Sequence, residues 1–195
     1  MPLHLDMSAI ASLRQATWHC HQRLEKRLDV KQRFSSRHLY RTHLEKMWGF
    51  CSPLERQFDA HIFDEALFDH ESRRKLPLLA GDLNVLGVTA QSLPECPAIP
   101  AFADTAAAFG GAYVLEGATL GGRTLLSMVR TQLGLTPYHG ARFLAGYGEH
   151  TAAMWRTFGA ALDAWCATDA SRLTAGSAAV ATFEALEVWL CGNLA

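Results

Sequence analysis

Residues 108–128 read AFGGAYVLEGATLGGRTLLSM, a run with helical periodicity that carries five glycines between positions 110 and 122. Glycine inside a helix costs about 1 kcal/mol relative to alanine, so this density needs a physical reason. One reason is tight packing between helices, and another is a helix whose backbone lies directly against a flat ligand. Gly117 and Gly121 are four residues apart and share a helix face, as the second reason requires. A phosphate-binding loop is a poor alternative, because the GxxxxGK pattern is missing and no strand is predicted before the glycines.

The remainder of the chain also follows helical periodicity, and no two-residue alternation is long enough to predict a sheet. We therefore expect one all-α domain spanning residues 1–195, with about seven to nine helices. The first helix is expected from its N-cap Ser8 to about Leu28, and the second begins near Ser35 with a kink or short break at Pro53. Three prolines predict a loop at 93–100. Further helices are expected within 63–88, 101–133, 138–147, 149–167 and 171–193.

The composition is that of a soluble globular protein, with 49% hydrophobic and 19% charged residues among 195. A formal charge of −1 excludes a global basic field, so we expect neither nucleic acid nor an anionic membrane surface as a partner. Five widely spaced cysteines form no CxxC pair, which favours reduced thiols in a cytoplasmic protein. The sequence shows no signal-peptide pattern and no apolar run long enough for a membrane span.

A helical wheel of residues 10–28 separates two neighbouring histidines. His21 falls on the apolar stripe and is expected to face the core, whereas His19 falls on the opposite, polar face. Glu25 lies one turn after His21 and can accept a hydrogen bond from one ring nitrogen, which would leave the other nitrogen free for a metal ion. His21 is therefore either a buried core histidine or a metal ligand. The apolar stripe contains Ile10, Leu13, Thr17, His21, Leu24 and Leu28, with Ala16 and Cys20 at its edge.

LRQATWHCHQRLE (13–25) and the glycine-bearing run together resemble the heme oxygenase family. The first segment is similar to the proximal-helix pattern of that family, in which a Leu-x-x-Ala-Thr run precedes the histidine that ligates the heme iron. Registering on Ala16-Thr17 makes His21 the implied ligand and Glu25 its carboxylate partner. The glycine-bearing run resembles the kinked distal helix, and EGATLGG is closest to bacterial members. Weaker similarity is found in LAGDLNVLG (79–87), MWRTFGAALD (154–163) and ATFEALEVWL (181–190).

The resemblance implies an all-α fold with heme between these two helices. Heme would be both cofactor and substrate, and O2 with an external electron donor would convert it to biliverdin, carbon monoxide and ferrous iron. A redox partner protein or a small reductant would deliver the electrons, and a bacteriophytochrome is a further partner that the resemblance suggests. The implied site residues are Gly117 and Gly121 in catalysis, His21 on iron, and Arg14, Glu25, Tyr113, Gly122 and Arg156 in heme binding, with the two arginines facing the propionates.

One departure from the family pattern keeps alternatives open. Animal members carry an aspartate after the first distal glycine, where this chain has Ala118. A heme-binding protein of the same fold that does not degrade heme is therefore the second hypothesis. A third is a thiaminase-like member of this architecture, which would need a nucleophilic cysteine. Cys20 has no evident activating partner, which ranks this hypothesis last.

Overall fold

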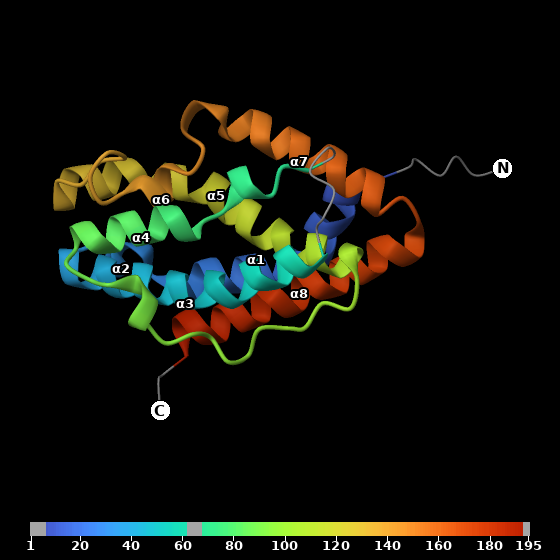
Figure 1. Cartoon of the computed structure of the whole chain (residues 1–195), viewed down its shortest axis with the longest axis horizontal. Helices are drawn as coiled ribbons and strands as arrows, with labels where there is room; N and C mark the ends of the chain where they lie inside the picture. Colours follow the sequence, from blue (N-terminus) through green and yellow to red (C-terminus); the bar gives the residue numbers. More distant parts are fainter. Residues whose placement is uncertain (1–6, 62–67, 193–195) are drawn as a thin grey trace.

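The computed structural model describes residues 7–61 and 68–192, and helices account for most of both ranges. The eight α-helices of these ranges are α1 (Ala9–Leu28), α2 (Val30–Arg33), α3 (Arg37–His61), α4 (Leu76–Val85), α5 (Thr105–Leu133), α6 (Arg142–Ala145), α7 (Thr151–Trp165) and α8 (Asp169–Cys191). No strand occurs among the described residues, apart from isolated bridges in the turn around Thr136. The all-α prediction is confirmed. In Figure 1, α7 lies along the upper edge of the molecule and α8 along the lower edge.

Helix α8 is the element against which both α1 and α5 make their most extensive contacts. Its packing face combines small residues such as Ala175 and Ala179 with the larger Phe183 and Leu186, all of them buried. A β-carbon added at Gly110 of α5 would overlap the carbonyl oxygen of Ala175, so the two backbones touch at this point. Close packing between helices therefore explains this glycine.

Pro53 does not break α3, which is unbroken from Arg37 to His61, so the predicted break at this position is wrong. A proline has no N–H to donate to the carbonyl four residues earlier, which here belongs to Gly49. The backbone N–H of Cys96 donates to the Gly49 carbonyl oxygen instead, at 2.9 Å. The predicted loop around 93–100 therefore supplies the hydrogen bond that the helix loses.

The other predicted boundaries agree to within a few residues, with one exception. Ser8 caps α1 and accepts a hydrogen bond from the N–H of Ala11. The helix expected at 138–147 covers only Arg142–Ala145, because Thr136 and His139 close a hydrogen-bonded turn ahead of it. Residues 63–67 of the segment predicted at 63–88 lie outside the described residues, and the rest contains the 3-10 turn Glu71–Arg73 and α4.

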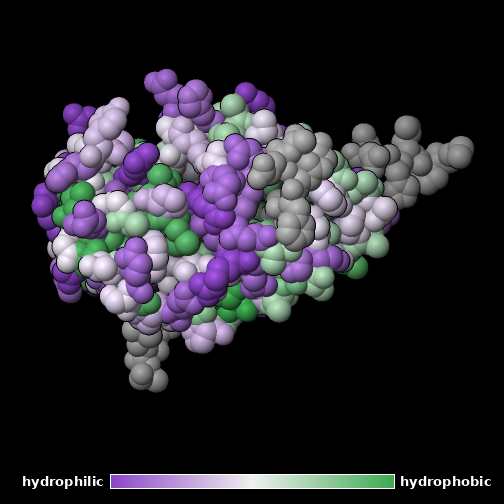
Figure 2. Space-filling view, in the orientation of Figure 1, coloured by the Kyte–Doolittle hydropathy of each residue, from purple (hydrophilic) through white to green (hydrophobic). Residues whose placement is uncertain are grey.

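The surface has a mixed character. Figure 2 shows hydrophilic residues crossing the middle of the viewed face and smaller hydrophobic patches toward its left end. No helix of the two described ranges is both long enough and apolar enough to cross a membrane.

Glu187 joins α8 to α1 from a position where its side chain is only 5% exposed. Its carboxylate accepts from Arg23 Nε at 2.5 Å and from Arg27 Nη1 at 2.6 Å. Burial raises the pKa of this carboxyl, but the two arginines outweigh burial and hold the pKa below its usual value. The contact therefore stabilises the fold when Glu187 is ionised.

We expect Glu187→Gln to lower the melting temperature at pH 7 by several degrees, because two charge-assisted hydrogen bonds are weakened. A carboxyl with a lowered folded-state pKa stabilises above its unfolded pKa of about 4.3, and this stabilisation is lost as the pH falls through the folded pKa. The difference between the variant and the wild type should therefore shrink below about pH 4. Thermal unfolding followed by circular dichroism from pH 3 to 7 measures it, and a difference independent of pH would contradict the account.

Candidate functional site

Helices α1 and α5 run in the same direction across the molecule (Figure 1). At the N-terminal end of α1, the N–H of Ala9 donates to Asp163 Oδ1, near the end of α7, at 2.6 Å. At the opposite end, Arg37 at the start of α3 donates to the carbonyl of Leu133, the last residue of α5, at 2.9 Å. Between these points the two helices pack mainly against α8 rather than against each other.

Thr17 and Tyr113 form a contact between α1 and α5. Burial raises the pKa of the Tyr113 phenol, and a hydrogen bond with Thr17 and the charge of Arg14 offset part of that effect. His21 lies one helical turn beyond Thr17, and Gly117 lies one turn beyond Tyr113. Because the helices run in the same direction, His21 and Gly117 follow this contact on the same side of it.

The His21 side chain is 54% exposed, so the expectation that it faces the core is wrong. The buried residues of α1 are Ala9, Leu13, Thr17 and Cys20, so His21 lies beside the buried stripe rather than within it. Its Nδ1 atom lies 3.5 Å from Glu25 Oε2, and its ring meets the edge of Phe183 at a centroid distance of 6.0 Å. One imidazole nitrogen thus faces a carboxylate, while a buried core histidine is excluded by the exposure.

The glycines of α5 divide into two groups. Nothing lies within 4 Å of a β-carbon built on Gly117 or on Gly121, so both glycines face open space. A β-carbon on Gly110 would overlap α8, and one on Gly122 would lie 3.1 Å from the carbonyl oxygen of Leu144 in α6. Packing accounts for Gly110 and Gly122, whereas it leaves Gly117 and Gly121 unexplained.

Of the remaining predicted residues, Arg14 lies near Tyr113, and Arg156 lies on α7 next to a residue that contacts Tyr113. The Tyr113 ring is buried and lies 5.9 Å from the ring of Trp155 in α7. Arg156 follows Trp155 and is exposed, and Arg14 is also exposed while its charge acts on Tyr113. Two accessible guanidinium groups therefore lie on α1 and α7, the helices on either side of Tyr113.

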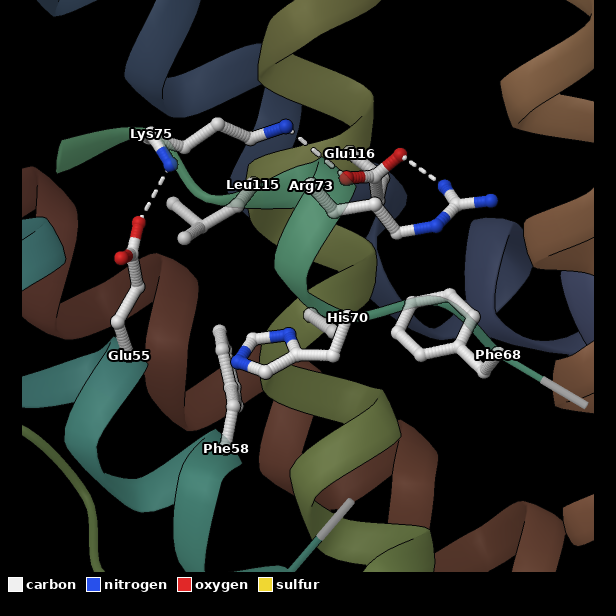
Figure 3. Close-up of a pocket in the computed structure, with 9 residues that line it drawn as sticks. Glu55, Phe58, Phe68, His70, Arg73, Lys75, Leu115 and Glu116 are labelled. Carbon is white, nitrogen blue, oxygen red and sulfur yellow. Dashed lines mark hydrogen bonds and ion pairs between the residues drawn. The ribbon is translucent and has the colours of Figure 1, made fainter. Parts of the chain in front are cut away.

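A buried ionic cluster joins α5 to the segment that precedes α4, and it was not predicted from the sequence. Glu116, Arg73 and Lys75 are 4%, 6% and 3% exposed, and Figure 3 shows the Glu116 carboxylate between the two cations. Glu55 and Phe58 line the same cavity, whose volume of about 20 Å³ matches one water molecule. The available signal was that Glu116 is the one charged residue in the stretch 105–122.

Comparisons with known proteins show what the chain is similar to. The sequence profile of the heme oxygenase family matches residues 7–191. A heme oxygenase from Xanthomonas campestris pv. campestris (strain 8004) is 37% identical over 112 residues, which cover 57% of this chain and 64% of that protein. The match thus spans slightly less than two thirds of the length of that relative.

Two solved structures share the fold. A heme oxygenase from Neisseria meningitidis, solved with NO and with CO bound, superimposes with a TM-score of 0.80 and 23% identity, covering 94% of this chain and 90% of the other. A heme oxygenase from Leptospira interrogans gives a TM-score of 0.72 and 16% identity, covering 95% and 99%. With the profile match over nearly the whole chain, the conclusion is that this protein belongs to the heme oxygenase family.

Proposed function

We propose that the protein is a heme oxygenase that cleaves heme oxidatively to biliverdin, carbon monoxide and ferrous iron, using O2 and external reducing equivalents. The observation that carries the proposal is the pairing of accessible His21 with Gly117 and Gly121, which face open space one and two turns beyond the contact between Thr17 and Tyr113. A planar macrocycle needs a ligand atom on one side and a backbone without β-carbons on the other. This chain has both, so its residues fit heme.

Each residue has a role in this proposal. His21 would hold the iron through Nε2, because Nδ1 faces Glu25, which orients the imidazole ring. The backbone at Gly117 and Gly121, which faces open space, would contact the macrocycle without interference from a β-carbon. Bound heme supplies the iron that activates dioxygen and the ring that is oxidised. Arg14 and Arg156 are accessible cations for the two propionates.

Tyr113 and Gly122 act less directly. Tyr113 borders the proposed site, where its buried ring supports the contact with α1. Gly122 packs against α6, so we assign it to the support of α5 rather than to heme contact.

Ala118 supports one alternative, a heme-binding protein without turnover. Its exposed methyl group cannot order water by hydrogen bonding, so any distal water would depend on backbone groups and other side chains. The thiaminase-like alternative is disfavoured, because Cys20 is only 7% exposed and lies within the hydrophobic core. Family membership favours the enzyme over both.

The electrons would come from a redox protein or a small reductant, and a bacteriophytochrome would be a consumer of the product. We place the protein in the cytoplasm. All five cysteines are unpaired, which supports a reducing compartment.

Hemin titration of the purified protein tests the proposal. A shifted Soret band should form and then decay to biliverdin absorption when a reductant is supplied in air. His21→Ala should abolish histidine ligation and weaken hemin binding at least about tenfold, equal to 1.4 kcal/mol. His19→Ala, the matched control on the other face, should retain both. A stable Soret band under turnover conditions would identify the binding protein instead, and loss of ligation in His19→Ala would show that the register is wrong.

Gly117→Ala should separate stability from function. The added methyl group meets open space and removes the entropy cost of a helical glycine, so the heme-free protein should gain about 0.5–1 kcal/mol. The same methyl would collide with bound heme, so hemin affinity should fall. Denaturant unfolding and hemin titration of the same preparation measure the two effects.

Gly110→Ala is the control, because its methyl overlaps α8 and should destabilise the fold by about 1–3 kcal/mol. A Gly117→Ala protein that binds hemin like the wild type would contradict the proposed location of the macrocycle.

A further inference from the structure

Glu116 connects the glycine-bearing part of α5 to three other segments. Its carboxylate accepts from Arg73 Nη1 at 2.8 Å, from Lys75 Nζ at 3.0 Å and from the Tyr147 hydroxyl at 2.5 Å (Figure 3 shows the first two). Arg73 lies in the 3-10 turn before α4, Lys75 immediately precedes α4, and Tyr147 follows α6. One side chain thus joins α5 to the segment that precedes α4 and to the segment that follows α6.

The donors are themselves held in place. Arg73 Nη2 also donates to the Met154 carbonyl at 3.1 Å and to Thr157 Oγ1 at 2.7 Å, both in α7. Burial, followed by the neighbouring Glu116 charge, raises the pKa of Tyr147, so its hydroxyl stays protonated and keeps donating. Lys75 Nζ also donates to the Tyr147 oxygen at 2.6 Å. A displacement of Glu116 would therefore disturb several hydrogen bonds at once.

The cluster contacts α5 next to a part of the helix surface that has no packing neighbours. Gly117 directly follows Glu116, and open space faces both Gly117 and Gly121. At the same turn, Thr119 Oγ1 donates to the Leu115 carbonyl at 2.9 Å, an arrangement that bends helices. The contacts that hold this turn in place therefore come from the segments around α4 and α6, and those made by Glu116 include two charged partners, Arg73 and Lys75.

We propose that Glu116 is a positioning residue that holds the Gly117–Gly121 turn in place and thereby determines which meso carbon of heme is cleaved. The inference deepens the proposed function and rests on it. A backbone that lies against a planar substrate restricts the space over each ring edge differently. A tenfold preference for one meso position corresponds to only 1.4 kcal/mol, so a small shift of this turn is enough to alter it.

Glu116→Gln tests the proposal, because the amide keeps the size of the side chain but loses the charge and cannot accept from all three donors. Glu55→Gln is the matched control. Glu55 is 2% exposed and lines the same cavity, but it accepts from the backbone N–H groups of Lys75 and Leu76 rather than contacting α5 through a hydrogen bond. Tyr147→Phe removes one donor only and serves if Glu116→Gln fails to fold.

The first measurement is amide hydrogen exchange of the heme-free proteins. Glu116→Gln should raise exchange at residues 117–122 at least about tenfold, an opening free-energy change of 1.4 kcal/mol, whereas Glu55→Gln should leave these amides unchanged. Tyr147→Phe should act at the same amides with a smaller effect. Unchanged exchange in Glu116→Gln would overturn the positioning role, whatever the activity of the protein.

The second measurement is the ratio of biliverdin isomers released by each hemin-loaded protein. Glu116→Gln should change the isomer ratio of the wild type at least about threefold with hemin affinity little altered, and Glu55→Gln should keep the wild-type ratio. If the wild type releases no biliverdin, the proposed function fails and the selectivity role fails with it. If the wild type turns over and Glu116→Gln gives the same ratio, or Glu55→Gln shifts it equally, the selectivity role is wrong while the proposed function stands.

Discussion

The backbone contact between Gly110 of α5 and Ala175 of α8 sets the distance between the two helices that share the largest interface in the described structure. Any side chain at position 110 would separate them. Helix α1 packs against the same α8 and is tied to it by Glu187 through Arg23 and Arg27. The relation between α1 and α5, and with it the proposed heme site, therefore depends on how closely each helix approaches α8.

Glycine has two distinct physical uses within α5. Gly110 and Gly122 allow close approach to other helices, where a β-carbon would meet backbone atoms. Gly117 and Gly121 face open space, so no close packing contact offsets the loss of helix stability that each glycine causes. Gly117 and Gly121 lie one and two turns beyond the contact between Tyr113 and Thr17 of α1. Glycines at such positions that no packing contact explains are expected at a ligand site. Glu116 supports this part of α5 from a neighbouring face of the helix, through its contacts with Arg73, Lys75 and Tyr147.

Much of the fold could be predicted from the sequence, because helical periodicity, the Ser8 cap and the proline-rich loop are local signals. Pro53 misled the prediction, since the hydrogen bond that compensates for it comes from Cys96, far along the chain. The wheel placed His21 in the core, because it records the apolar stripe but not which part of that stripe α8 covers.

The candidate site was predictable in part. The five glycines could be noticed together, but only their neighbours in space distinguish packing from an open face. The buried cluster could not be assembled beforehand, since Arg73 and Glu116 are 43 positions apart and such residues are usually solvated. A lone charge in an apolar helix was the sign that it needed partners.

The location of iron in crystals of the hemin-loaded protein tests the central claim most directly. Anomalous diffraction at the iron edge identifies the metal without reference to any assumed ligand. The account predicts a single iron peak within coordination distance of His21 Nε2, on the side of α1 that faces Gly117. A peak at His19, or one remote from both α1 and α5, would contradict it.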